Sequence, residues 1–260
     1  MAAARWYEPA ASLLRLIVPQ PCLGLTPYDS PRFSAFLAAA AAVPASMRTL
    51  LLRGVVSASG ELVAVADWRV LGRVLFLNGI AVAHSHRGGG LGTELVADGV
   101  RLAKSLGCSA AELDVAVGND PAAALYERAE FEPVGVTTWV ELSGEALAPP
   151  AAAGGSVLVA PAPARTATTW RVRNWPMFSA HFTAYGFGDV DLAGPGQSAA
   201  VRVLPSGWRL SGLEETAAAP AAVDALAAVL GERPAKAFVV GTTEESGVPI
   251  VSFRRLRRLV

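Results

Sequence analysis

Glycine is concentrated in one short stretch of this chain, at residues 88, 89, 90 and 92, directly behind Arg87. An apolar run over residues 74–82 precedes the stretch, and leucines at helical spacing follow it from Leu91 to Leu106. Glycines let backbone N–H groups approach a ligand closely, and the start of a helix favours negative charge. The stretch therefore predicts a cradle for a pyrophosphate group.

The sequence around the glycines excludes two common nucleotide-binding motifs. A P-loop needs GxxxxGK followed by Ser or Thr, and no glycine pair of the chain is followed in that way. A dinucleotide fingerprint needs GxGxxG, but counting from Gly88 the last position is Thr93, and counting from Gly90 it is Leu95. The cradle is therefore of another kind.

Two spaced motifs carry a resemblance to a known family. The pattern Arg/Gln-x-x-Gly-x-Gly/Ala is met by Arg87, Gly90 and Gly92, and the pattern Asn-x-x-Ala-x-x-Leu-Tyr is met downstream by Asn119, Ala122, Leu125 and Tyr126. A helix and a strand are expected between the two motifs. Over about residues 45–142 the chain therefore resembles the GNAT-type, acetyl-CoA-dependent N-acetyltransferases.

The resemblance implies direct transfer of an acetyl group from acetyl-CoA to a primary amine. The pantetheine arm would pair with the strand edge at Ile80, Ala81 and Val82, and a backbone N–H near Val82 would stabilise the oxyanion. Asn119 would steady the cofactor, while Tyr126 would face its sulfur and protonate the leaving thiolate. The diphosphate would be held by Arg87, Gly88, Gly89, Gly90, Leu91, Gly92 and Thr93.

The chain departs from the family pattern at two positions. Many relatives carry a glutamate on the strand before the cradle, but residues 73–82 read RVLFLNGIAV and contain no carboxylate. The proton acceptor for the amine therefore stays open among Asp114, Glu112, His84, His86 and a chain of waters. Glu130 stands where relatives usually place a glycine, a position suited to left-handed backbone.

Simpler interpretations stand beside these roles. Tyr126 is also explained as an aromatic on a core-facing helix, and Asn119 as a residue that caps that helix. His84 and His86 have no evident third partner, so no metal site is expected. A non-catalytic acyl-CoA-binding or regulatory module is the alternative function, because the usual strand glutamate is missing.

The expected fold class is α/β (α+β), with a central mixed, mostly antiparallel sheet flanked by helices. A hairpin is predicted from residues 49–56 and 61–68, followed by a strand at 74–82, a helix to Leu106 and a strand around 113–117. Asp120 is predicted to cap a helix that reaches Ala129, and residues 131–142 to form two short strands. Residues before 45 are expected to supply a first strand and helices, one of them at 33–43.

Residues 144–155 read GEALAPPAAAGG, which predicts a boundary between two domains. We expect an acetyltransferase domain at 1–146, a linker at 147–154 and a second, smaller α/β lobe at 155–260 that is an unrelated lobe or a degenerate GNAT-like copy. Its expected strands lie at 156–160, 169–173, 199–204, 208–213, 237–240 and 249–253, with a helix at 219–230. An aromatic stripe between Trp175 and Tyr185 predicts core packing.

The overall composition argues against some classes of binding partner. Lys plus Arg equals Asp plus Glu at 22 each, so binding of nucleic acid through overall charge is not expected. No apolar run reaches the ~20 residues that a membrane crossing needs, and two isolated cysteines predict a reducing, cytoplasmic setting. The expected partner is a small-molecule or peptide amine, with a homodimer through the second lobe as one alternative. The arginines at 254, 255, 257 and 258 are expected to be solvated.

Overall fold

The computed structural model of the chain describes residues 4–142, 144–148, 170–194, 196–241 and 247–260. The chain forms two compact units, each built from more than one segment. The first unit holds residues 1–20, 31–136 and 253–260, and the second holds residues 21–30 and 137–252. No helix among the described residues is long and apolar enough to cross a membrane.

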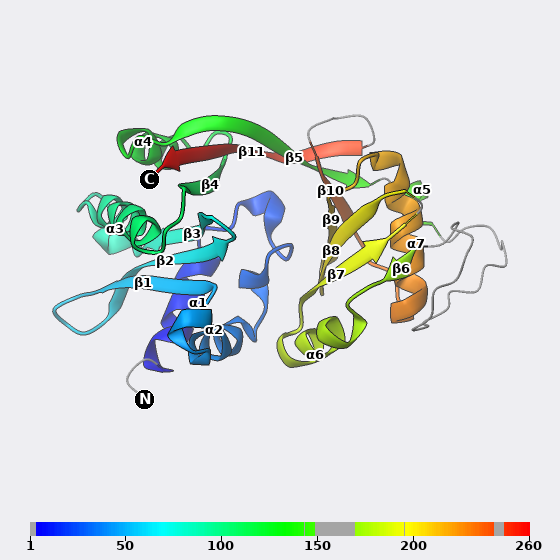
Figure 1. Ribbon diagram of the computed structural model, residues 1–260, viewed down its shortest axis with the longest axis horizontal. Helices are drawn as coiled ribbons and strands as arrows, with labels where there is room; N and C mark the ends of the chain where they lie inside the picture. The colour runs from blue at the N-terminus through cyan, green and yellow to red at the C-terminus, as the bar shows by residue number, and fades with distance from the viewer. Residues whose placement is uncertain (1–3, 143, 149–169, 195, 242–246) are drawn as a thin grey trace. The chain divides into compact units, whose positions relative to one another are not determined.

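The first unit is built on a meander followed by a crossover (Figure 1). Strands β1 (Leu50–Val56), β2 (Leu62–Leu71) and β3 (Val74–Val82) pair antiparallel, and β3 then runs parallel to β4 (Ala110–Ala116) through helix α3 (Leu91–Ser105). The end of β11 (Gly247–Leu259) pairs antiparallel with β4. The remaining elements are helices α1 (Tyr7–Arg15), α2 (Phe33–Ala42) and α4 (Asp120–Arg128) and the start of β5 (Glu132–Leu142).

The core of the first unit lies between its sheet and α3. Ala64, Ala66 and Trp68 alternate along β2 and are fully buried in this core, as expected for a strand with one face under a helix. Trp68 fits because Gly99 of α3 has no side chain, since a Cβ added at Gly99 would lie 1.9 Å from the indole ring. The missing side chain at Gly99 and the bulk of Trp68 therefore set how closely α3 approaches the sheet.

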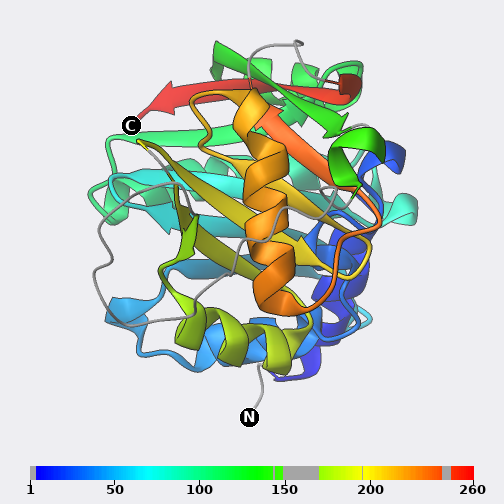
Figure 2. The same cartoon turned by 90° about the vertical axis from the view of Figure 1, so that its right-hand side faces the viewer.

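The second unit repeats this order of elements. Strands β7 (Gly188–Ala193), β8 (Ser198–Leu204) and β9 (Gly207–Ser211) form an antiparallel meander, and β9 runs parallel to β10 (Ala237–Gly241) through α7 (Ala219–Leu230). Figure 2 shows α7 lying across the strands of this unit. The end of β5 pairs antiparallel with β10, and β6 (Arg171–Val172) pairs with β7. Helices α5 (Gly144–Leu147) and α6 (Trp175–Tyr185) complete the unit.

The two units share a meander, a crossover helix and a parallel strand, which agrees with the expected fold class and with a second GNAT-like lobe. They differ at the turn before the crossover helix. Where the first unit has its glycines, residues 212–218 of the second read GLEETAA, with Glu214 and Glu215 in the turn. Two carboxylates would repel a diphosphate, so the second turn lacks the chemistry of the first.

Most predicted elements are confirmed, and several details differ. The hairpin and the strand at 74–82 form as expected. No strand lies within residues 4–49, where a first strand was expected, and residues 132–142 form one strand rather than two. Strand β7 was not predicted. The strand predicted at 169–173 covers only Arg171–Val172 among the described residues, and that at 156–160 lies outside them.

The arginines near the end of the chain were expected to be solvated, but the structure places them on a paired strand. They lie on β11, where Arg255 and Arg257 stand directly opposite Asp114 and Glu112 of β4 and bond to them. Leu256, between them, is buried in the core of the first unit. Opposite charges facing each other across two strands support that pairing register. The predicted domain limits of 1–146 and 155–260 stay a prediction, because most of the linker lies outside the described residues.

Candidate functional site

The glycine loop joins β3 to α3 in an open conformation. Gly88 and Gly90 have φ angles of 79° and 82°, in the left-handed region that favours glycine, and Gly90 is the N-cap of α3. A Cβ added at either position would meet no heavy atom within 4 Å. The first helical hydrogen bond runs from Glu94 N–H to the Gly90 carbonyl, so the N–H groups of residues 91–93 have no partner within the helix. The exposed loop can therefore present several donors to an anion.

Strand β3 has an open edge immediately before this loop. Its parallel pairing with β4 ends at Leu77 and Leu113, while its pairing with β2 continues to Val82. Among the described residues, none therefore forms a strand pair on the β4 side of residues 79–82, although the Val82 carbonyl accepts a bond from Nε of Arg87 at 3.2 Å. This segment includes Ile80, Ala81 and Val82, the residues predicted to receive an extended ligand, and such an edge can accept a strand-like partner.

A bulge at Asn78 separates the paired and unpaired parts of β3. Asp67 of β2 stands opposite Gly79 and Trp68 opposite Leu77, so Asn78 is the extra residue. Its side chain donates to Asp67, which is fully buried and is also held by Arg69 through two bonds of 2.7 Å. This cluster was not predicted, although one polar residue inside each of two apolar runs was a signal for it.

Helix α4 brings Asn119 and Tyr126 to the same region as the loop. Asn119, rather than the predicted Asp120, is its N-cap, and its side chain accepts a bond from the Ala122 N–H at 3.4 Å. A Cβ added at Gly92 would lie 3.4 Å from Leu125, so the start of α3 packs against α4. The simpler interpretation of Asn119, as the residue that caps α4, is therefore confirmed.

Tyr126 is the buried residue of α4. Its side chain is 5% exposed and makes an edge contact with Phe131, with ring centroids 6.1 Å apart. Burial raises the pKa of its phenol to about 12, so the hydroxyl stays protonated at neutral pH. No described residue forms a hydrogen bond with this hydroxyl. Core packing and a role as a proton donor are both compatible with this environment.

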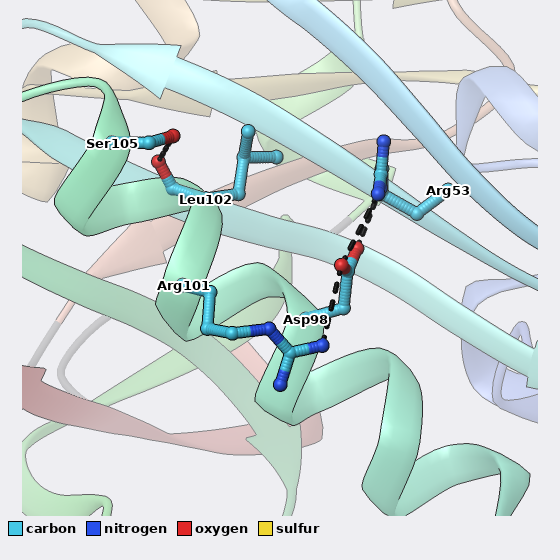
Figure 3. A network of polar contacts seen from close by, with 5 residues as sticks. All are labelled: Arg53, Asp98, Arg101, Leu102 and Ser105. Atoms are coloured by element: carbon cyan, nitrogen blue, oxygen red, sulfur yellow. Dashed lines mark hydrogen bonds and ion pairs between the residues drawn. The ribbon is translucent and has the colours of Figure 1, made fainter.

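A cavity of about 400 Å³ lies elsewhere in the first unit. Its lining comes from α1, β1 and neighbouring residues, among them Trp6, Tyr7 and Arg53, and includes none of the predicted site residues. Beside it, Arg53 of β1 binds both carboxylate oxygens of Asp98 on α3, at 2.6 and 3.1 Å, and Arg101 adds a longer contact (Figure 3). This network links the helix behind the glycine loop to the edge of the sheet.

Comparison with known families identifies one domain of the chain. Residues 16–131 match the model of the acetyltransferase (GNAT) family. The chain carries a GNAT acetyltransferase domain. No curated protein matches the sequence.

Solved GNAT structures cover both units of the chain. A tandem GNAT protein from the clavulanic acid biosynthesis pathway aligns with 99% of this chain and 94% of its own length, with a TM-score of 0.59 and 12% identity. A GCN5-related N-acetyltransferase from Sphaerobacter thermophilus aligns with 97% of this chain and 92% of its own, with a TM-score of 0.56 and 13% identity. These two likenesses establish the fold alone.

A shorter match covers less of its counterpart. The ribosomal-protein-S18-alanine N-acetyltransferase from Escherichia coli is 23% identical with a TM-score of 0.35, and the match spans 40% of this chain and 63% of that one. GNAT proteins bind acetyl-CoA as their acetyl donor. The open glycine loop and the free edge of β3 have the chemistry that such a ligand requires, namely N–H donors and an unpaired strand.

Within this GNAT domain the candidate proton acceptors have different surroundings. Glu112, nearly buried, pairs with Arg257 at 2.6 Å, and Asp114 pairs with Arg255. His84 and His86 lie exposed in the short helix before the loop. Both carboxylates are therefore paired with arginines, whereas the histidines face solvent.

The two free cysteines are buried, and burial raises the pKa of each thiol, to about 11 for Cys22. A raised thiol pKa does not favour a nucleophilic role.

Proposed function

We propose that this protein is an N-acetyltransferase that moves the acetyl group of acetyl-CoA directly to a primary amine. The observation that supports the site most strongly is the end of β3–β4 pairing at Leu77, which leaves residues 79–82 without a strand partner on that side shortly before the glycine loop. The strand edge ends at Val82 and the glycines begin at Gly88, so an unpaired strand edge is followed closely by a loop of free N–H groups. This order suits the two halves of one long ligand.

The proposed contacts divide acetyl-CoA between the strand edge and the glycine loop, with helix α4 beside them. Ile80, Ala81 and Val82 pair through their backbone with the pantetheine arm. Asn119 holds α4 in place beside the cofactor, and its bond to Ala122 explains how. The diphosphate is bound by Arg87 and by the backbone of Gly88, Gly89, Gly90, Leu91, Gly92 and Thr93, where the loop geometry leaves space for it.

When bound, acetyl-CoA supplies an activated thioester. The amine nitrogen would bond to the acetyl carbon, the carbon–sulfur bond would break, and its electron pair would leave with the sulfur. The proton displaced from the nitrogen would pass to one of the candidate acceptors or to water, and the Tyr126 phenolate would regain a proton from solvent. Tyr126 donates its phenolic proton to that sulfur, and a backbone N–H near Val82 stabilises the carbonyl oxygen. Because the pKa of Tyr126 is about 12, the phenol is present as the donor at any ordinary pH. The acceptor is a small-molecule or peptide amine, and the two free, buried cysteines support a reducing, cytoplasmic setting.

The test is a thiol-release assay with the purified chain, acetyl-CoA and a panel of primary amines, compared with Tyr126→Phe. We expect one or more amines to release coenzyme A, and Tyr126→Phe to lower kcat roughly 10²-fold while the Kd for acetyl-CoA stays the same. Equal rates in the two proteins would remove Tyr126 from the mechanism. Tight binding with no turnover on any amine would support the non-catalytic acyl-CoA-binding module instead, which the engaged Glu112 and Asp114 favour.

A further inference from the structure

The last strand of the chain reaches the end of helix α4 through one arginine. Arg258 donates from Nη1 to the carbonyl of Ala129 at 2.7 Å, and its Nη2 lies 2.7 Å from a carboxylate oxygen of Glu130. Ala129 is the C-cap of α4, where carbonyls lack helical partners and cations are favoured. We call Arg258, Ala129 and Glu130 the α4 clamp.

Glu130 occupies a backbone conformation that its residue type disfavours. Its φ of 61° makes it the one non-glycine residue with positive φ among the described parts of the chain. Such strain persists where surrounding contacts hold it. A glycine would adopt this conformation freely but could not bind Arg258. The departure from the family glycine therefore coincides with a contact that only a side chain can make.

The clamp holds the turn in which Tyr126 takes part. The carbonyl of Tyr126 accepts bonds from the N–H groups of both Ala129 and Phe131, on either side of Glu130. Helix α4 has only nine residues, and Tyr126 is the one that is buried. A helix this short is marginal without tertiary contacts, so its position depends on the Asn119 cap at one end and on the clamp at the other.

We propose that Arg258 is a positioning residue, which fixes α4 through Glu130 and Ala129 and so sets where the Tyr126 hydroxyl lies in the acetyl-transfer site. This inference rests on the proposed function for its effect on catalysis. The physical link itself, from strand β11 to the C-terminal turn of α4, does not depend on the reaction. Reactive groups displaced by about 1 Å can lose roughly 10²-fold in rate, so a loosened α4 has a measurable effect.

Arg257 provides the matched control on the same strand. Its side chain pairs with Glu112 of β4 at 2.6 Å, and among the described residues it forms no hydrogen bond or ion pair with Ala129 or Glu130. In Arg257→Met, Glu112 keeps Arg255, whose Nη1 lies 3.6 Å from a carboxylate oxygen. Arg257→Met and Arg258→Met each remove one ion-paired arginine from β11 and add the same side chain. A general weakening of the strand would therefore affect both variants, whereas loss of the clamp affects only Arg258→Met.

The experiment measures two quantities on the full chain. Hydrogen exchange of the amides in residues 120–131 reports on α4 without any substrate. We expect about tenfold faster exchange there in Arg258→Met and wild-type exchange in Arg257→Met. Steady-state kinetics then compares the variants with and without Tyr126→Phe. We expect Arg258→Met to lower kcat about tenfold in the wild-type background and to have no further effect in Tyr126→Phe.

The outcomes separate the clamp from the proposed reaction. Equal exchange of α4 in Arg258→Met and Arg257→Met would overturn the clamp. An equal loss of kcat from Arg258→Met with and without Tyr126 would overturn positioning through that tyrosine. If Tyr126→Phe retains full activity, the proposed acid role fails, and the exchange measurement still decides whether the clamp holds α4. Arg258→Lys keeps the charge with a single donor group, so intermediate exchange in that variant would support a bidentate contact.

Discussion

Gly90 and Gly107 share a conformation but stand at opposite ends of helix α3. Both have positive φ, 82° and 69°, and a Cβ added at either would meet nothing within 4 Å. Gly90 is the N-cap beside the strand edge, whereas Gly107 follows the C-terminal end. The same residue type therefore serves a candidate ligand site at one end and a helix termination at the other.

This pair gives a prediction for substitution by alanine. Gly90→Ala and Gly107→Ala should each lower the free energy of unfolding by about 1 kcal/mol, because alanine is strained at positive φ. Only Gly90→Ala should also weaken acetyl-CoA binding, since only it alters the loop. Urea unfolding with and without acetyl-CoA measures both effects. Equal ligand stabilisation in the two variants would place the cofactor elsewhere.

The buried phenol of Tyr126 gives a prediction for pH. Its pKa rises from 10.0 to about 12 on folding, so its contribution to stability is complete below pH 10 and is lost as pH rises through the folded pKa. Between about pH 9 and about pH 11 the wild type should lose about 1 kcal/mol more than Tyr126→Phe. Urea unfolding of both proteins at the two pH values measures this difference. Parallel losses would show that the phenol titrates normally in the folded state.

Helix α4 depends on its N-cap residue as well as on its last turn. The Asn119 side chain is the described cap for a nine-residue helix that begins Asp120-Pro121. Asn119→Ala should lower the free energy of unfolding by about 1 kcal/mol, while Asn119→Asp, which keeps an acceptor oxygen, should lose little. Thermal unfolding of the three proteins checks this. If Asn119→Asp weakens acetyl-CoA binding without changing stability, Asn119 contacts the ligand in addition to capping.

The elements around the site were the most predictable from sequence. The strand at 74–82 and the helix after it were read from a change in hydrophobic periodicity, which depends only on local sequence. Strand β7 was missed because GDVDLA is short and carries two aspartates, which strands disfavour. The cap was placed at Asp120 instead of Asn119 because both residue types suit that position.

The parts that could not be predicted depend on distant pairing. No local signal tells that the arginines of β11 meet Glu112 and Asp114, residues about 140 positions earlier in the chain. The free edge of β3 likewise follows from where its pairing with β4 stops. The motif residues were predictable as a set, but the bulge at Asn78 and the clamp by Arg258 emerge only from tertiary contacts.

The whole chain is divided differently in space and in sequence. Residues 253–260 belong to the first compact unit although they follow the second in the chain. They pair along β4 from Ala110 to Ala116 and bring Leu256 into the core. An acetyltransferase domain cut at residue 146 would therefore lack one strand of its sheet.

A chain that ends at Ser252 should be markedly less stable. It leaves Glu112, whose side chain is 8% exposed, without both Arg255 and Arg257, and leaving a buried charge without any partner costs about 3 kcal/mol or more. We expect a lower Tm and loss of acetyl-CoA binding, both partly restored by adding a peptide of residues 253–260. An unchanged Tm would contradict the account of β11 as part of the first unit.

The central claim is that the glycine loop binds the diphosphate of acetyl-CoA. Isothermal titration of wild type, Gly90→Asn and Gly90→Asp tests it most directly, because the two variants have nearly the same shape and both residue types tolerate left-handed backbone. We predict that the wild type binds, that Gly90→Asn binds more weakly, and that Gly90→Asp loses binding through repulsion of the diphosphate. Equal affinities of the Asn and Asp variants, or no binding by the wild type, would contradict the claim.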